Sequence, residues 1–528
     1  MTLKPLGDSA WLAEFPGISG AAALARVMGL LDALQTGRPP GVLDVVPSFD
    51  SLAVHSTPAT GLEILEWIKS VTMTDRPPAG GEWQIPVCYG GDNGPDLDEV
   101  AAHSGLSMAE VITLHCGAVY TVAAVGFSPG FPYLLGLPER LQVKRRHTPR
   151  LAVPAGSVAI AGGQAGIYPF TSPGGWQVLG RTNVSLFNPL MPRPALLRTG
   201  DRVRFVPVGE LAPREEISCG TVVAGERWIE VIEPGAMTTV QDLGRPGHES
   251  SGVSPGGAVD RQALRIANLL VGNDAGAAAL EICMSGPILK FHHETVVALA
   301  GASGKSQRVA AGETVDFSKL PGGVRACLAV AGGLCVPSLL DSLATDLRAG
   351  FGGHCGRALQ AGDRLAIGQA GEIPRCGAWH VGRPERLSEI ELRFLPGVQQ
   401  HWFTDEARRR FRTEAYQLTP RADRMGVRLA GVGLELNEPR EMISQPVACG
   451  SVQVPPDGQP IVLLAERQTI GGYPQIGQVI SVDLPRLARA WPGTAVRFRE
   501  VNEEEARDLW HRQQQDFKWL QTGLKLLL

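Results

Sequence analysis

One Gly/Pro-rich block occurs twice in this chain, about 300 residues apart, in residues 153–176 and 448–474. Each copy has Gly-Ser-Val near its start and then alternates apolar and polar residues until it reaches a glutamine, Gln164 in the first copy and Gln459 in the second. Alternation with a period of two is typical of half-buried strands. The repeat therefore predicts a duplicated β-domain built from strand–turn–strand units.

Length and composition narrow the class of protein. At 528 residues the chain is long enough for three or four domains. Its 64 glycines and 40 prolines form no low-complexity run, which indicates the turns of folded β-structure. The net charge of −4, with no basic stripe, argues against nucleic acid as a partner. No apolar run reaches the ~20 residues of a membrane-spanning helix.

The nine cysteines are scattered and form no CxxC pair. Together with an N-terminus that does not resemble a secretory leader, they predict a reducing, cytoplasmic location. We expect no membrane association and no metal site, because no His/Cys cluster has the spacing of zinc ligands.

The pattern of apolar residues divides the chain into segments. The N-terminal part reads strand, helix, strand, strand, helix, which fits a ferredoxin-like half-sandwich. Short strands with frequent turns then indicate barrels or sandwiches. The predicted segments are a ferredoxin-like α/β subdomain at 1–80, a β-unit at 81–210, a linker at 211–227, β-units at 228–388 and 389–500, and a terminal helix at 501–528.

Two short motifs resemble catalytic signatures without meeting their requirements. Residues 126–130 match G-x-S-x-G, but the nucleophile elbow needs a backbone N–H after the serine and Pro129 has none. Residues 304–306 resemble the end of a phosphate-binding loop, but Leu299 stands where that loop needs glycine. We expect both segments to be structural.

Three other stretches combine flexible glycines with side chains that bind anions or amides. Arginine offers a planar fork to carboxylate or phosphate, and glutamine can read an amide with a donor and an acceptor. The candidate catalytic residues are Arg467, Gln459, Asp457 and Arg424. The candidate substrate-binding residues are Gln241, Asp242, Arg245, Gln453, Gly471, Gly472, Tyr473, His115, Gly163, Gln164 and Trp176. Turn formation and surface ion pairs are the alternative for each of them.

Long motifs around these residues resemble a known pair of families. Residues 1–210 resemble the B subunit of 5-oxoprolinase, a family also called carboxyltransferase subdomains C and D. The resemblance rests on the motifs GFSPGFPYLLGLPERL and TPRLAVPAGSVAIAGGQAGIYPFTSPGGW. Residues 228–500 resemble the C subunit of 5-oxoprolinase, also called carboxyltransferase subdomains A and B. This resemblance rests on the motifs VIEPGAMTTVQDLGRPGH and QVPPDGQPIVLLAERQTIGGYP. The resemblance implies that this chain is a fusion of the B and C subunits. The implied fold class is mostly β with α+β, in which three tandem cyclophilin-like β-barrels follow the ferredoxin-like subdomain.

The resemblance also implies a function. It predicts an ATP-dependent enzyme component that works with the separate A subunit of 5-oxoprolinase and opens the lactam of 5-oxo-L-proline to L-glutamate by phosphorylation, with ATP and Mg²⁺ as cofactors. A biotin-dependent carboxyltransferase acting on urea or a related amide is one alternative, although this chain has no biotinyl Ala-Met-Lys-Met site and so carries no covalent biotin. A non-enzymatic regulator of the kinase-inhibitor type is another. A homo-oligomer is compatible with all three.

A few positions depart from the family pattern. Asp423 replaces an expected Asn, Gly256-Gly257 replaces Ser-Gly, and Glu466 replaces an Asp before Arg467. These changes leave the choice of substrate more open than the fold.

Overall fold

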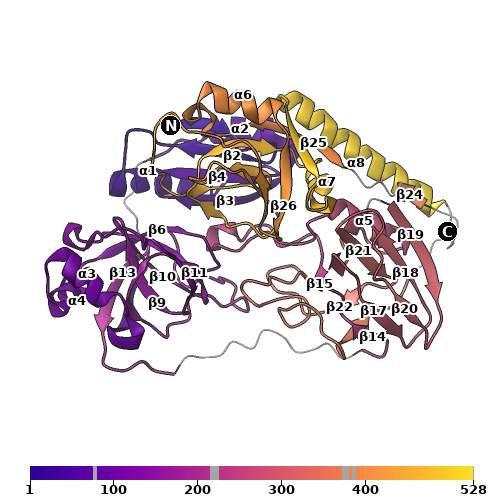
Figure 1. Cartoon of the computed structure of the whole chain (residues 1–528), viewed down its shortest axis with the longest axis horizontal. Helices are drawn as coiled ribbons and strands as arrows, with labels where there is room; N and C mark the ends of the chain where they lie inside the picture. The colour runs from indigo at the N-terminus through magenta and orange to yellow at the C-terminus, as the bar shows by residue number, and fades with distance from the viewer. Residues whose placement is uncertain (75–79, 214–224, 302, 372–379, 383–387, 527–528) are drawn as a thin grey trace.

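The computed structural model describes residues 1–74, 80–213, 225–301, 303–371, 380–382 and 388–526. Two closed barrels, a two-sheet unit and a small N-terminal α/β unit make up the molecule, and a long helix ends the chain. In Figure 1 the first barrel (purple) and the two-sheet unit lie at opposite ends, with the N-terminal unit and the second barrel above and between them. The predicted linker at 211–227 falls largely outside the described residues.

The N-terminal unit has the predicted split β-α-β arrangement. Its elements are β1 (Thr2–Pro5), β2 (Ala10–Glu14), α1 (Gly20–Ala33), β3 (Val42–Ser48), β4 (Ser51–Ser56) and α2 (Gly61–Ser70). The sheet order is β1-β2-β4-β3 with antiparallel neighbours, so β2 and β3 run parallel on either side of β4. Strand β1, which the sequence pattern did not predict, extends the sheet beside β2.

The first barrel closes seven strands in the order β10-β7-β6-β13-β5-β12-β9. These are β5 (Glu82–Tyr89), β6 (Tyr120–Val125), β7 (Pro132–Leu135), β9 (Ser157–Ala161), β10 (Gln164–Ile167), β12 (Gln177–Arg181) and β13 (Arg202–Pro207). Helices α3 (Leu97–Ser104) and α4 (Met108–Gly117) follow β5, and a capping box of Ser107 and Glu110 begins α4. Strands β8 (Arg150–Val153) and β11 (Ser172–Gly174) form a separate ribbon.

The second barrel repeats this topology strand for strand. Its strands are β25 (Glu389–Pro396), β26 (Tyr416–Ala422), β27 (Gly426–Ala430), β29 (Ser451–Gln453), β30 (Ile461–Leu463), β32 (Gln475–Val479) and β33 (Ala495–Glu500). Read from β30, the order is β30-β27-β26-β33-β25-β32-β29. In both barrels the first strand along the chain pairs in parallel with the last, β5 with β13 and β25 with β33. Helix α6 (Asp405–Thr413) follows β25, α7 (Leu484–Arg489) follows β32, and β28 (Gln445–Pro446) pairs with β31 (Ile470–Gly471).

The duplicated block keeps its register in three dimensions. Ala159 pairs with Gly166 in the first barrel and Gln453 with Ile461 in the second, so the residue two after each serine faces the residue two after each glutamine. The glycine before the serine has positive φ in both copies, 85° at Gly156 and 93° at Gly450. A Cβ there would lie 2.0 Å or 2.4 Å from a backbone oxygen, which only glycine avoids. The predicted duplication is confirmed.

The middle unit differs from the barrel expected at 228–388. Its strands form a five-stranded sheet, β20-β17-β14-β23-β22, and a six-stranded sheet, β15-β16-β21-β18-β19-β24, and neither closes within the described residues. An apolar core that includes Val231, Leu289, Val297 and Leu328 fills the space between the sheets. The unit is therefore a pair of packed sheets in the part of the chain that the structure describes.

The elements of this two-sheet unit are β14 (Trp228–Glu233), β15 (Met237–Gln241), α5 (Arg261–Leu270), β16 (Ala279–Cys283), β17 (Ile288–Phe291), β18 (Thr295–Ala300), β19 (Ser303–Val309), β20 (Thr314–Asp316), β21 (Arg325–Val330), β22 (Leu334–Cys335), β23 (Arg364–Ile367) and β24 (His380–Gly382). Helix α5 contacts β18, β19 and β21.

The terminal helix α8 (Glu503–Lys525) begins where the sequence predicts, with Asn502 accepting a hydrogen bond from the Glu505 backbone N–H at 2.8 Å. One side of the helix packs on α5: Leu524 is buried there, and the Arg265 guanidinium lies 3.8 Å from the centre of the Phe517 ring. No described helix is long and apolar enough to cross a membrane. The seven cysteines that the structure describes are unpaired.

Candidate functional site

Loops from four units meet at one place, which we call the loop junction. It comprises residues 126–130 of the first barrel, 241–260 and 339–356 of the two-sheet unit, and 464–473 of the second barrel. Gly130 donates a backbone hydrogen bond to Ser251 at 2.9 Å, and Gly256 donates one to Ala465 at 3.1 Å. The N-terminal unit joins through Asp44, whose carboxylate accepts from the Ser250 backbone N–H at 3.1 Å.

The junction contains unusual backbone conformations. Five described non-glycine residues have positive φ, and four of them lie in the junction: Phe127, Leu340, Asp341 and Cys355. Side chains other than glycine rarely adopt this conformation, and where it occurs the surrounding structure must hold it. The G-x-S-x-G turn is thus an interdomain contact rather than a nucleophile elbow: the Arg348 Nη1 reaches the Phe127 carbonyl at 3.5 Å.

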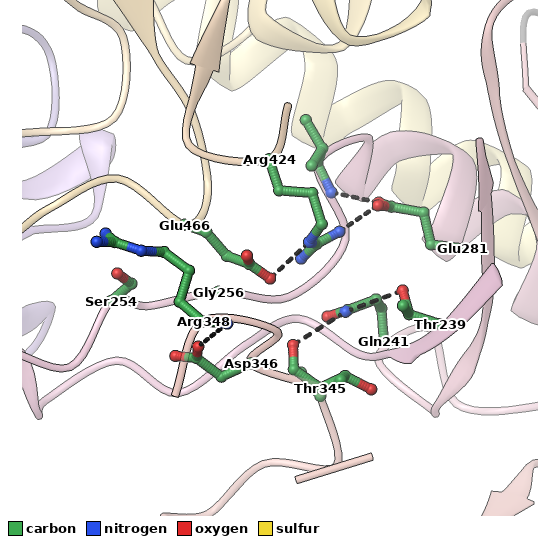
Figure 2. Close-up of polar contacts among 12 residues, drawn as sticks. Thr239, Gln241, Ser254, Gly256, Glu281, Thr345, Asp346, Arg348, Arg424 and Glu466 are labelled. Atoms are coloured by element: carbon green, nitrogen blue, oxygen red, sulfur yellow. Dashed lines mark hydrogen bonds and ion pairs between the residues drawn. The ribbon is translucent and has the colours of Figure 1, made fainter. Parts of the chain in front are cut away.

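Arg424 joins the second barrel to the two-sheet unit (Figure 2). Its Nε donates to Glu466 at 2.6 Å, its Nη2 donates to the Gly257 carbonyl at 2.6 Å, and its Nη1 pairs with Glu281. All three side chains are buried. Burial by itself lowers the pKa of Arg424, but the two carboxylates outweigh it and raise that pKa above its ordinary value. These contacts occupy all three guanidinium nitrogens of a residue that we expected to meet substrate.

Arg245, by contrast, keeps free donors although it is fully buried. Its Nη2 donates to the Ala344 carbonyl, and its guanidinium lies 4.7 Å from the centre of the Phe351 ring. Its Nε and Nη1 find no partner among the described residues. Burial lowers the pKa of Arg245, and Asp346 and Asp242 oppose that shift.

Gln241 and Asp242 support this part of the junction. The Gln241 Nε2 donates to Thr239 and to the Thr345 carbonyl, as Figure 2 shows, while its buried Oε1 has no partner in the described part of the chain. Asp242 accepts from the backbone of Gly244 and Leu343. It therefore holds the two loops of the two-sheet unit together.

Arg467 enters the junction from the second barrel. Its Nη2 donates to Glu249 at 2.7 Å, and its backbone carbonyl accepts from Ser254 at 2.6 Å. The Nε and Nη1 of this buried side chain have no partner among the described residues. The same Glu249 oxygen lies 3.6 Å from the Nε2 of His55. Burial, and next the Glu249 charge, raise the pKa of Asp44 to about 6.

These orphaned groups indicate what the junction can bind. A buried donor without an acceptor costs about 1–3 kcal/mol, so four such N–H positions on Arg245 and Arg467 are a strained arrangement unless an anion completes them. The free Oε1 of Gln241 can accept from an amide N–H. Free donors of this kind suit a small anion, and the free acceptor suits an amide. In the described residues, no three His, Cys, Asp or Glu side chains are grouped to hold a metal ion.

Four of the predicted site residues that lie outside the junction belong to hairpins of the two barrels. Asp457 and Gln459 belong to the β29–β30 turn, where Asp457 accepts from the Gln459 backbone and the Gln459 side chain bonds to both backbone groups of Gly431. Gly163 lies in the exposed turn between β9 and β10, and Gln164 is the half-buried first residue of β10, paired with Ala161. Their spacing in the sequence reflects the geometry of the hairpins, and the fold does not bring them to the site of Arg467 as we expected.

His115 is a core residue of the first barrel. It is fully buried, its Nδ1 is 2.7 Å from the Tyr89 hydroxyl, and its ring stacks on Phe205 at 4.6 Å between centroids. Burial lowers the pKa of His115 to about 3, so it is neutral near pH 7. The expected role in substrate binding does not fit this position. Trp176 is likewise buried among aromatic rings, 5.8 Å from Phe131 between centroids.

Of the remaining predicted residues, Gly471, Gly472 and Tyr473 lie in the junction, and Gln453 contacts it. Gln453 is buried and bonds to Gln468 and to the Tyr473 carbonyl. Gly471 lies in β31, where a Cβ would approach the Gln453 amide to 2.5 Å. Gly472 is half-buried beside it and the Tyr473 side chain is exposed. They shape the second-barrel side of the junction.

Sequence reasoning missed the acidic partners Glu249, Glu281 and Asp346, and with them Asp44 and His55. No local pattern marks them, because Glu249 meets Arg467 across 218 positions and Glu281 meets Arg424 across 143. The one available signal was that Glu249 follows directly on the long motif ending in PGH.

Comparison with known families agrees with this division of the chain. The carboxyltransferase domain, subdomain C and D, matches residues 1–197, and the carboxyltransferase domain, subdomain A and B, matches residues 251–500. The crystal structure of TTHA0988 is 37% identical in sequence and superposes with a TM-score of 0.81, covering 93% of this chain and 99% of that one.

Each half also resembles a separate protein. The 5-oxoprolinase C subunit of Escherichia coli K12 is 40% identical over 304 residues, which are 55% of this chain and 97% of that protein. The 5-oxoprolinase B subunit of Escherichia coli O157:H7 is 42% identical over 212 residues, 39% of this chain and 95% of that protein. The urea amidolyase of Saccharomyces cerevisiae is 30% identical over 56% of this chain, but the match covers 18% of that protein. The chain therefore belongs to the carboxyltransferase-domain family of the 5-oxoprolinase B and C subunits, with one member of each type joined in a single polypeptide.

Proposed function

We propose that this chain is the joined B–C component of an ATP-dependent 5-oxoprolinase, which opens 5-oxo-L-proline to L-glutamate together with a separate A subunit. The observation that carries the proposal is that relatives of both types are matched over nearly their full length. The loop junction supports it, because the B-type and C-type halves meet there around buried arginines with free donors.

The substrate fits the chemistry of the junction. 5-Oxoproline carries a carboxylate and a lactam, which match the free N–H groups of Arg245 and Arg467 and the free acceptor of Gln241. An amide is a poor electrophile, and ATP, when bound, supplies the phosphoryl group that turns the lactam oxygen into a leaving group. Arginines also stabilise the charge that develops on phosphoryl oxygens.

The expected cofactors fit this chain in part. The buried arginines suit phosphate oxygens, whereas the described residues group no ligand set for Mg²⁺. Residues 304–306 lie inside strand β19, paired with β18, and not at the start of a helix as a phosphate-binding loop requires. We assign to Arg245, Arg467 and Gln241 the binding and orientation of the anionic substrate.

The test measures the phosphate and glutamate that are released from ATP and 5-oxoproline by the chain by itself, by the isolated A subunit, and by the two together. We expect product only from the mixture. Gln241→Glu, which places a negative charge at the substrate position, should suppress turnover, while the matched control Gln459→Glu on the exposed turn should not. Silence with a folded, bound A subunit, or carboxylation of urea by a biotin carrier, would contradict the proposal.

A further inference from the structure

A hollow of about 510 Å³ lies in the two-sheet unit, away from the loop junction. Strands β18 and β19 of the six-stranded sheet form one side, and β20 with the loop that follows it forms the other. Figure 1 shows these strands at the outer end of the unit. The volume is within the range of about 300–1,000 Å³ that is usual for small-molecule sites.

The floor of this hollow is apolar. Val297 and Leu299 contribute it from β18, and Phe317 and Leu320 close it from the segment after β20. Val297 and Phe317 belong to the buried core between the sheets. A ligand lying here would bury the hydrocarbon part of its structure against these side chains.

The wall from β19 is polar. Gln307 pairs with Val297 and Lys305 pairs with Leu299 across the strands, so both side chains point to the same side as the apolar floor. Val309, two residues further along the same face, is buried in the core. Two exposed polar side chains therefore face the hollow, on the side of β19 that further along the strand carries the buried Val309.

Protection of a sheet edge does not explain the lysine. An inward-pointing charge is a common device on exposed edge strands. Strand β19 is not an edge, because β24 pairs with it from Ser303 to Lys305. Among the described residues, Lys305 has no hydrogen-bond or ion-pair partner, and its exposed side chain lines the hollow.

The charge at the mouth is positive. Lys305 and Lys319 line it, and Asp316 is its one described acidic residue. The Asp316 carboxylate accepts from the Ser318 backbone N–H at 2.7 Å and is thereby held at the rim. A cationic mouth over an apolar floor is complementary to a molecule with an anionic end and a hydrocarbon body.

We propose that this hollow is a second ligand site, which binds a small amphipathic carboxylate with its hydrocarbon part on Val297, Leu299 and Phe317 and its carboxylate at Lys305. In the sheet, β19 stands four strands from β15, which carries Gln241 into the junction. At about 4.8 Å per strand, the two sites are roughly 20 Å apart. The proposal goes beyond the proposed function and does not depend on it.

The test titrates the full chain with octanoate by isothermal titration calorimetry, without ATP or the A subunit, so that its result is separate from that of the turnover assay. We expect saturable binding of one octanoate per chain. Lys305→Gln should weaken it about fivefold, as expected for one partly exposed ion pair. Arg308→Gln is the matched control, because Arg308 is the next charged residue on β19 and lies on its other face.

The neutral analogue 1-octanol separates charge recognition from apolar partition, and we expect it to bind more weakly than octanoate and to be insensitive to Lys305→Gln. Three results would overturn the proposal: no saturable binding of octanoate, equal weakening by Lys305→Gln and Arg308→Gln, or equal affinity for octanoate and octanol. Lys305 is exposed, so its replacement leaves the fold intact and each result is interpretable.

Discussion

The Nη2 of Arg467 and the Oε2 of Glu249 are 2.7 Å apart, and both side chains are buried. This ion pair joins the second barrel to the two-sheet unit, and His55 brings the N-terminal unit to within 3.6 Å of the same carboxylate oxygen. Three units of the chain therefore depend on one carboxylate. The attraction within a buried ion pair adds little to stability, because burying both charges costs free energy. Removing one partner is nevertheless strongly destabilising, because the other charge is left buried without compensation.

Arg467→Ala should destabilise the protein by about 3–5 kcal/mol, because it leaves Glu249 buried without its partner. Gln459→Ala, which removes side-chain hydrogen bonds on an exposed turn, should cost less than about 1 kcal/mol. Urea unfolding followed by tryptophan fluorescence measures both. The double variant Arg467→Ala/Glu249→Ala should recover part of the loss; strictly additive effects would show that the pair is not coupled.

Asp44 should make stability depend on pH. Its folded pKa of about 6 lies above its ordinary value, so the folded state holds the proton more tightly and is stabilised by it at low pH. That stabilisation is lost as pH rises through 6. Relative to Asp44→Asn, the wild type should lose about 2 kcal/mol of unfolding free energy between about pH 4.5 and pH 7. Asp516→Asn, on the exposed face of α8, is the control and should give a flat difference.

His115 should act in the opposite direction. Its folded pKa of about 3 lies below its ordinary value, so the folded state resists protonation and stability falls as pH drops below about 6.5. Against His115→Gln, the wild type should lose about 3 kcal/mol between about pH 8 and pH 4.5. Turnover at neutral pH should survive in any variant that folds. A selective loss of substrate affinity in a folded variant would return His115 to the binding site.

Gly252 tests the contact between the first barrel and the two-sheet unit. It has a φ of 78°, and a Cβ there would lie 2.6 Å from the Ser128 carbonyl oxygen. Gly312 has a similar φ of 84° but open space around it, so Gly312→Ala measures the backbone strain alone. We expect Gly252→Ala to cost about 1–3 kcal/mol more than Gly312→Ala in urea unfolding and to lower turnover. If both substitutions lowered the free energy of unfolding equally, the Ser128–Gly252 contact would rearrange to accept a methyl group at no cost.

Much of the fold could be predicted from local patterns. The N-terminal elements, the helix caps at Ser107 and Asn502 and the repeated strand–turn–strand block follow from spacing and turn residues within short windows. The closed barrels were implied by the family resemblance. Local patterns did not decide that the described strands of 228–388 form two sheets, because alternating strands do not specify whether a sheet closes or packs on a second sheet. Closure depends on which strands pair, and that pairing joins distant segments.

The sequence by itself determined the duplication and the family, because the glycines at 156 and 450 and the hairpins after them obey local backbone rules in both copies. Only the tertiary structure decided which polar residues share a site. Arg467 of the second barrel meets Glu249 of the two-sheet unit, and Arg424 meets Glu281, whereas Asp457 and Gln459 stay on a turn outside the junction. The physical reason is that burial and ion pairing depend on neighbours in space, which lie more than 100 positions away in the chain.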